Sequence, residues 1–283
     1  MSDPATTALT SALDNSAKVA NTPLFATVID RILGFKISEW NAQGETIKKQ
    51  ILDGYEEAKQ KGLGIQYVSA FRSNANLINT SIKAAKYIIS EAKGVIEIDN
   101  DVFWGLLEHS KLISSEEMQE LIAKILAGEY NAPGTYSMST LQILKSLGKD
   151  ELENFSLLGD VYLPGHGFFR DFFGLNTEAV AARTKINLDY TNFLEMQNLG
   201  LIQSGAYTIS IPVKKDEMFK MEYGDGVIIV KALEDKANWD FPECYQLTNA
   251  GKQIRQHLAK RESAVFREWL KNYLKKEGLE VLT

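Results

Sequence analysis

Apolar residues recur at helical spacing through the first half of the chain and give way to alternating segments in the second half. Three short apolar-faced segments lie within residues 114–158, separated by turns that contain glycine and proline, and this pattern predicts three helices. Ser114 and Glu117 have the spacing of a capping box at the start of the first helix. Gly128 and the Pro133-Gly134 pair end that helix and form a turn before the second.

Longer helical patterns precede these three helices. A charged pattern over residues 38–62 and an apolar one over 65–93 are separated by a glycine-containing break, which predicts an antiparallel helical hairpin. A short amphipathic helix is predicted over 22–34, and another helix begins at Asp99 or Asn100. Residues 1–20 are rich in Ala, Ser and Thr, which predicts a poorly ordered segment or a loose amphipathic helix.

The second half changes period. A predicted helix over 188–202 is followed by alternating segments, with Tyr223-Gly224-Asp225-Gly226 as a hairpin turn, and then by one long helix over 249–276. The predicted strands are 206–213, 218–222, 227–233 and 244–248. A helix, a strand hairpin and a further helix in this order resemble a winged helix.

These patterns together predict a mainly α chain. An all-helical N-terminal domain covers residues 1–160, and a junction rich in glycine and phenylalanine covers 161–175. A winged-helix-like α+β domain with a long C-terminal amphipathic helix covers 176–283. The four phenylalanines of the junction are expected to fill the boundary between the two halves.

One stretch of about 45 residues resembles a known family. The strings EEMQELIAKILAGE, PGTYS, STLQILKSL and ENFSLL are similar to the core motif of a bacterial domain of unknown function, the family numbered 2806. Ile122 departs from the pattern, which has a tryptophan at that position. The family is related in pattern to the abortive-infection alpha proteins, and the resemblance therefore implies a role in antiphage defence without implying a particular activity.

Composition narrows the class of protein. The apolar content of 45% and charged content of 24% are those of an ordinary globular protein. The single cysteine, Cys244, excludes an intrachain disulfide and favours a reducing cytoplasm. The chain starts without a secretory pattern, and no apolar run approaches the ~18 residues that span a bilayer. We therefore expect a cytoplasmic protein with no membrane partner.

The winged-helix-like region raises the question of DNA binding. The net charge of −6 argues against a non-specific polyanion binder. The predicted reading helix exposes Asp189, Asn192, Glu195 and Asn198, which bring two carboxylates and no base. The residues that could contact phosphates are Arg183, Lys185, Lys214, Lys215 and Lys220. Contact with a protein is favoured over contact with DNA, and DNA stays open as an alternative.

No catalytic motif is visible. The three histidines have no metal-ligand spacing, and no phosphate loop, nucleophile elbow or Cys/His pair is found in the sequence. His166, Arg170 and Asp171 are candidates for a pocket rimmed by phenylalanine, although filling of a domain boundary is the commoner use of such aromatics. No cofactor and no metal site are expected.

Three classes of function follow. The favoured hypothesis is a non-enzymatic interaction protein of antiphage defence or abortive infection that binds a protein partner or forms a homo-oligomer. A winged-helix DNA-binding regulator is the second hypothesis. A toxin-like nuclease, or another enzyme whose residues meet only in the folded state, is the third.

Overall fold

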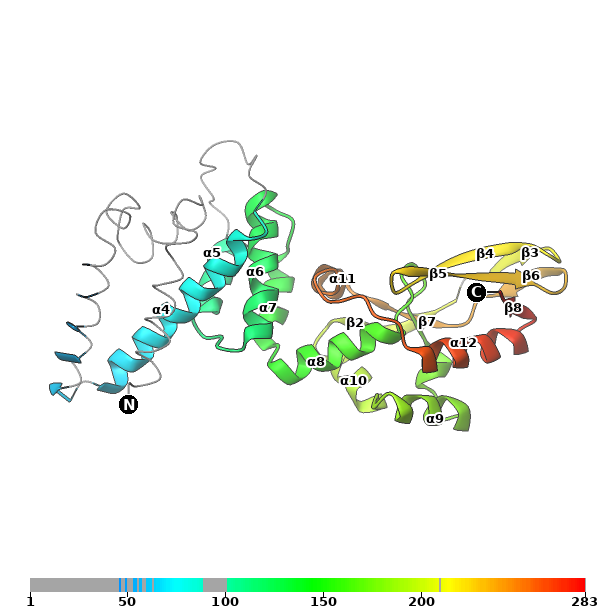
Figure 1. Cartoon of the computed structure of the whole chain (residues 1–283). Helices are drawn as coiled ribbons and strands as arrows, with labels where there is room; N and C mark the ends of the chain where they lie inside the picture. The colour runs from blue at the N-terminus through cyan, green and yellow to red at the C-terminus, as the bar shows by residue number, and fades with distance from the viewer. Residues whose placement is uncertain are drawn as a thin grey trace. The chain divides into compact units, whose positions relative to one another are not determined.

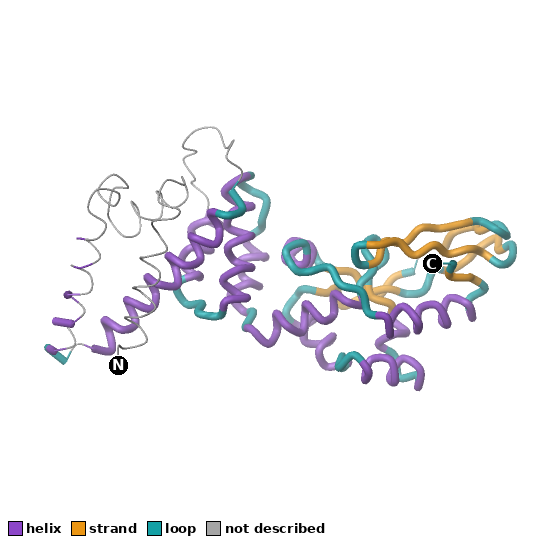
Figure 2. The backbone as a smooth tube through the Cα atoms, viewed as in Figure 1, coloured by secondary structure: helices purple, strands orange, loops and turns teal. Residues whose placement is uncertain are grey.

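The computed structural model describes residues 64–88, 101–208 and 210–282, with isolated positions between 46 and 62. The chain divides into two compact units, Met1–Lys145 and Ser146–Thr283. The predicted elements over 1–20 and 22–34, and most of that over 38–62, lie outside the described residues. Figure 1 labels the elements, and Figure 2 shows that the strands of the described residues lie in the second unit.

The described part of the first unit is helical. It contains α4 (Gly64–Ala85), α5 (Asp101–Ser110), α6 (Glu116–Asn131) and α7 (Met138–Ser146), of which α6 packs against both α4 and α5. The apolar stripe of α6 is fully buried because its residues recur at the 3.6-residue period. Its core is aliphatic for the most part, with Leu106, Leu107, Ile122, Ile125 and Leu126 at 0% exposure.

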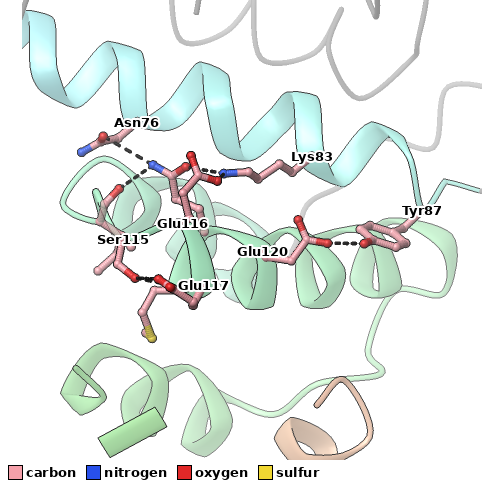
Figure 3. A network of polar contacts seen from close by, with 10 residues as sticks. Asn76, Lys83, Tyr87, Ser115, Glu116, Glu117 and Glu120 are labelled. Atoms are coloured by element: carbon pink, nitrogen blue, oxygen red, sulfur yellow. Dashed lines mark hydrogen bonds and ion pairs between the residues drawn. The ribbon is translucent and has the colours of Figure 1, made fainter. Parts of the chain in front are cut away.

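Polar side chains join α4 to α6 along one side of this core (Figure 3). Lys83 forms an ion pair with Glu116, and its Nζ donates to Gln119 Oε1 at 2.8 Å. Gln119 is 2% exposed, and its Nε2 donates to the Ile113 carbonyl at 2.9 Å. Tyr87, which follows the C-terminal end of α4, hydrogen-bonds Glu120 of α6. The two helices are therefore held in register by side chains whose polar groups are satisfied.

The turn after α6 is built on Glu129. This carboxylate is fully buried and accepts the backbone N–H groups of Gly134 at 2.6 Å and Tyr136 at 3.0 Å. A Cβ on Gly128 would lie 2.6 Å from the Tyr136 hydroxyl, so this position requires a residue without a side chain. The strings LAGE (residues 126–129) and PGTYS (residues 133–137) are therefore joined in one turn by the hydrogen bonds of Glu129.

The cap of α6 differs by one residue from the prediction. Ser115, not Ser114, is the N-cap, and its side chain accepts from the Met118 N–H at 3.4 Å. The Ser114 hydroxyl instead accepts from Arg72 Nε at 3.0 Å and Asn76 Nδ2 at 3.2 Å. Ser114 therefore bonds α4, and Ser115 is left to cap α6.

The second unit begins with a small sheet surrounded by helices. In chain order it contains α8 (Lys149–Leu158), η1 (Gly159–Val161), β1 (Phe168–Phe169), η2 (Arg170–Phe173), α9 (Thr177–Lys185), α10 (Tyr190–Asn198) and β2 (Ile202–Tyr207). After an insertion it returns through β7 (Cys244–Leu247) to α11 (Asn249–Arg255). The three strands pair antiparallel in the order β1-β7-β2.

The insertion carries two further antiparallel sheets. The strands β3 (Ser210–Val213) and β6 (Lys236–Asp240) form a ribbon. The strands β4 (Met218–Tyr223) and β5 (Gly226–Ala232) form the hairpin predicted from residues 223–226, and that prediction is confirmed. The third strand of their sheet, β8 (Leu279–Val281), follows α12 (Ala264–Lys276) and pairs with β5.

The prediction of a mainly α chain is wrong: the structure is α+β. The sequence pattern did not reveal β8, nor the division of 206–213 between two sheets, because both depend on pairing with distant strands. The predicted long helix over 249–276 is also wrong, since α11 and α12 are separate helices. Arg255 NH1 donates to the carbonyls of Leu258 and Ala259, and Ser263 caps α12.

The core of the second unit is aromatic. Phe172 lies 4.8 Å from Trp269 and 4.9 Å from Phe266, ring centre to ring centre, in edge-on geometry. Phe173 stacks on Phe193 of α10 at 4.2 Å. The phenylalanines of residues 168–173 are thus packed among α10, α12 and the small sheet, inside the second unit. The division predicted at residues 160 and 175 stays a prediction.

Candidate functional site

A cavity of about 340 Å³ lies in the second unit beside the β4-β5-β8 sheet. We call it the aromatic cavity because four of its lining residues carry aromatic rings. Its lining residues are His166, Met218, Phe219, Lys220, Met221, Val230, Trp239, Phe241, Leu274 and Leu279. They come from the sheet, from β6 and the residue after it, from α12, and from the loop before β1.

Strand alternation builds one wall. Phe219 pairs with Val230, and Met221 with Ile228, so these side chains share one face of the β4–β5 hairpin. Met221 and Val230 are 3% and 2% exposed, whereas Lys220, on the intervening position, is exposed. The hairpin therefore presents an apolar face to the cavity and a charged face to solvent.

Aromatic rings form the other wall. Trp239 on β6 lies 6.4 Å from Phe219 and 5.5 Å from Phe241, and Phe241 stacks on His166 at 4.8 Å. Trp239 is 5% exposed, and its Nε1 is a buried donor with no hydrogen-bond partner in the described part of the chain. Buried indole N–H groups usually find an acceptor. This donor is therefore an exception that needs a physical reason.

His166 is the one predicted pocket residue that lines the cavity. Burial lowers the pKa of its imidazole, so the ring is neutral near pH 7. Its carbonyl accepts from the Gln246 side chain, which fixes the loop to β7. Gly167 has a φ of 106°, and a Cβ there would lie 2.3 Å from the Tyr245 carbonyl oxygen, so only glycine fits after His166.

The other two predicted pocket residues are bound elsewhere. Arg170 is exposed and pairs with Glu243 through its guanidinium, and its backbone N–H donates to the Glu243 carbonyl at 2.8 Å. Asp171 accepts from the Tyr273 hydroxyl at 2.6 Å. Burial, followed by this hydrogen bond, raises the pKa of Tyr273. Arg170 and Asp171 therefore tie η2 to the segment before β7 and to α12.

A second concave surface, the α9–α10 groove, has a different chemistry. It has a volume of about 530 Å³. Neutral amide, hydroxyl and aliphatic groups dominate its lining, and Val180 is 40% exposed there. The lining residues are Asn154, Leu157, Val180, Arg183, Thr184, Asn187, Leu188, Asp189, Thr191 and Asn192. Asp189 and Asn192 bind each other's backbone as a capping box at the start of α10.

Arg183, a predicted phosphate contact, is 5% exposed. Its guanidinium donates to the carbonyls of Phe172 and Gly174 and lies over the Phe173 ring at 5.9 Å. Burial lowers its pKa. The charge is thus used inside the unit, where it joins α9 to η2, while Lys185 at the end of α9 is exposed.

The lysines predicted in the wing lie among acids. Lys214 and Lys215 follow β3, and both are exposed. Their backbone N–H groups donate to Glu217 Oε2 and Asp235 Oδ1 at 2.9 and 2.8 Å. Asp216, between Lys215 and Glu217, pairs with Lys231 at 2.6 Å. Lys220 on β4 is also exposed. This segment is therefore mixed in charge.

Sequence reasoning missed Phe219, Trp239 and Phe241. Their only signal is alternation, with Trp239 and Phe241 two positions apart at the end of β6, and any buried strand gives the same signal. Cys244 is not a reactive thiol, because burial raises its pKa to about 12. The described residues contain no group of three His, Cys, Asp or Glu side chains able to hold a metal ion.

One family model matches the chain over residues 68–271, with the description "Protein of unknown function (DUF2806)". The match covers more than half of the chain. The chain belongs to this family. The DUF2806 match runs from α4 into α12 and includes both the Glu129 turn and the α9–α10 groove. Leu274 and Leu279 of the aromatic cavity lie beyond it.

No curated protein and no solved structure matches this DUF2806 chain. Among the described residues, no helix combines the length and the apolar character needed to cross a bilayer.

Proposed function

We propose that this chain is a non-enzymatic interaction protein of bacterial antiphage defence that acts in the cytoplasm by binding a protein partner through the α9–α10 groove. The link to defence rests on the resemblance of residues 116–158 to the family numbered 2806 and on the similarity in pattern between that family and the abortive-infection alpha proteins. The choice of a protein partner rests on the chemistry of the groove. The neutral, partly apolar lining of that groove is the observation that carries the proposal.

The order of elements supports a winged-helix relationship. A helix, a short strand, two helices, a strand and a returning strand follow one another as α8, β1, α9, α10, β2 and β7, and the sheet order is β1-β7-β2. In that arrangement the residues between β2 and β7 take the place of the wing. The helix that would read a major groove is α10.

The surface of α10 fits a polypeptide better than a polyanion. Its sequence, YTNFLEMQN, contains no Lys or Arg, and Tyr190 and Leu194 are each 37% exposed. DNA carries one negative charge per ~1.7 Å of duplex, and binding depends on cations that neutralise it. The nearest arginine, Arg183, is occupied by two backbone carbonyls. Depletion of charged residues and enrichment of aromatic residues mark the centre of a protein-binding surface, and the exposed Tyr190 fits this composition.

A pair of valine variants tests the groove. Val180 lines it at 40% exposure, and Val227 on β5, outside it, is 45% exposed. Tagged wild-type protein, Val180→Arg and Val227→Arg are used as bait in phage-infected and uninfected cells. The captured partner is then purified and titrated against each bait. Val180→Arg is expected to weaken binding at least tenfold, which corresponds to about 1.4 kcal/mol, and Val227→Arg to leave it unchanged.

Duplex DNA is titrated against the same three proteins at 50 and 200 mM salt. The proposal expects weak binding that Val180→Arg does not reduce, because an added cation can only favour a polyanion. Tight, salt-dependent binding that is lost when Lys214, Lys215 and Lys220 are replaced by Gln would overturn it in favour of a regulator. Self-association of the pure protein that is lost only in Val180→Arg identifies a second copy as the partner.

A further inference from the structure

We propose that the aromatic cavity is a binding site for a small, uncharged, planar heteroaromatic molecule that carries a hydrogen-bond acceptor in its ring plane. This site is separate from the α9–α10 groove, because no residue lines both. A chain that docks on a protein partner through one surface would in this way also bind a small molecule through another.

Size and shape are the first argument. A volume of about 340 Å³ lies within the range of roughly 300–1,000 Å³ typical of ligand pockets. Phe219, Trp239 and Phe241 follow one another around it with ring centres 5.5–6.4 Å apart. Aromatic walls favour a flat ring, which stacks on one wall and meets the edge of another.

The indole of Trp239 is the second argument. A buried donor without a partner costs about 1–3 kcal/mol, and in the described residues Nε1 is such a donor. A carbonyl or ring nitrogen in the ligand would recover this loss on binding. Met218 and Met221 on β4 also line the cavity, and Met218 is 62% exposed. Since methionine side chains adapt their shape readily, this wall can give the ligand access to the indole.

The absence of acidic side chains is the third argument. No Asp or Glu lines the cavity, and its one charged lining residue, Lys220, is exposed to solvent. His166 is half-buried and stacks on Phe241. A cation would lose its hydration here without gaining a counter-charge. An anion would meet only the solvent-exposed ammonium group of Lys220, and exposed ion pairs contribute little. Aromatic cages also bind quaternary ammonium ions, but a cation cannot accept from the Trp239 N–H.

Three probes of known chemistry separate these properties. 2-Quinolone is neutral, planar and has a carbonyl acceptor; naphthalene has a similar shape without the acceptor; tetramethylammonium is a cation. Each is titrated into full-length protein by calorimetry. The variants are Trp239→Phe, which keeps an aromatic wall and removes the donor, and Trp104→Phe, a matched change on α5 in the other unit.

Binding of 2-quinolone is expected to be tighter than that of naphthalene. Trp239→Phe is expected to weaken 2-quinolone about tenfold while changing naphthalene less than twofold, and Trp104→Phe to change neither. A loss confined to the probe with an acceptor isolates the hydrogen bond, because both probes stack alike.

Wild-type protein labelled with ¹⁵N-tryptophan gives an independent readout. One indole N–H signal, identified by its disappearance in Trp239→Phe, is expected to move downfield with 2-quinolone and not with naphthalene. If Trp239→Phe fails to fold, a single downfield signal that moves only with 2-quinolone supports the proposal. The absence of binding by 2-quinolone, equal losses for both ring probes, or a preference for tetramethylammonium overturns it.

Discussion

The cores of the two units are built from different kinds of side chain. The described part of the first unit packs aliphatic residues between helices and links α4 to α6 with a polar network that includes the buried Gln119. Its buried Glu129 is bonded within the turn after α6. The second unit packs phenylalanines and Trp269 between helices and small sheets. Between helices, rows of aliphatic side chains pack as ridges into grooves. In the second unit short strands meet helices at several angles, and large aromatic rings fill the spaces between them.

The difference bears on where function can reside. In the first unit the prominent buried polar groups are used to position the backbone, as Glu129 does for its turn. In the second unit the rings leave a cavity, and Trp239, one of its lining residues, has a buried Nε1 with no hydrogen-bond partner among the described residues. An aromatic core with a residual cavity is suited to a planar ligand. A helical core whose buried Gln119 and Glu129 are hydrogen-bonded is suited to holding a surface in place.

The largest expected effect separates the two cores. Among the described residues, Phe172 has three ring neighbours at 4.8–5.5 Å, and Phe103 in the first unit has two at 5.3 and 6.4 Å. Replacing either with Ala should cost about 3–5 kcal/mol. Because each ring pair contributes about 0.5–1.5 kcal/mol beyond burial, Phe172→Leu should destabilise more than Phe103→Leu.

Hydrogen exchange followed by mass spectrometry measures this effect unit by unit, which a single unfolding curve cannot do for a chain of two units. Phe172→Leu is expected to increase exchange in the second unit and Phe103→Leu in the first. Equal costs for the two leucine variants would mean that the rings act only as apolar volume.

The next effect concerns the Glu129 turn. Glu129→Ala leaves the N–H groups of Gly134 and Tyr136 without their acceptor, and the expected loss in unfolding free energy is about 1–3 kcal/mol. Glu129→Gln retains one acceptor oxygen and should cost less. Glu108→Ala, which removes a surface ion pair with Lys111, is the matched control and should cost at most about 1 kcal/mol. Exchange at residues 128–138 is the measurement, and an unchanged rate in Glu129→Ala contradicts the role assigned to this carboxylate.

The smallest effect is a pH dependence present in both units. Burial lowers the pKa of His109 in the first unit and of His166 in the second. Each histidine has its ordinary pKa, about 6.5, when the chain is unfolded. The unfolded state therefore binds protons first as pH falls, so stability is full above about pH 6.5 and declines toward each folded pKa.

Histidine-to-glutamine variants show which histidine causes the loss of stability at low pH in each unit. His109→Gln should flatten the decline in the first unit alone, and His166→Gln in the second alone. Exchange measured at pH 7.5 and 5.5, corrected for the intrinsic rate, is the test. A decline that persists unchanged in the first unit of His109→Gln would assign it to other groups.

Local signals in the sequence predicted the elements that local chemistry decides. The β4–β5 hairpin follows from Gly224 and Gly226 in its turn, and α6 follows from its stripe and its serines. The break between α11 and α12 was missed, although the apolar period is interrupted there: the positions three and four residues after Leu258 are Arg261 and Glu262. What separates the helices is Arg255, bonded to Leu258 and Ala259, and Tyr223, whose hydroxyl accepts from the Ser263 N–H at 2.7 Å.

The candidate sites were less accessible to sequence reasoning. His166 was identified because a histidine among glycines and prolines is conspicuous. Phe219 lay within the predicted strand 218–222 with nothing to distinguish it, and Trp239 lay in none of the predicted strands. Arg183 was assigned to phosphate from its charge, but its surroundings include the carbonyls of Phe172 and Gly174, which only the folded chain brings near. Composition shows which side chains are present, and burial in the folded chain determines which of them are accessible to a partner.

The Glu129 turn sets two strings of the family motif apart from the candidate binding surfaces. The strings LAGE and PGTYS form the connection between α6 and α7, and neither candidate binding surface includes them. In this chain these two strings therefore encode the geometry of a helix connection, and what the chain recognises is to be sought in the second unit, where both candidate surfaces lie.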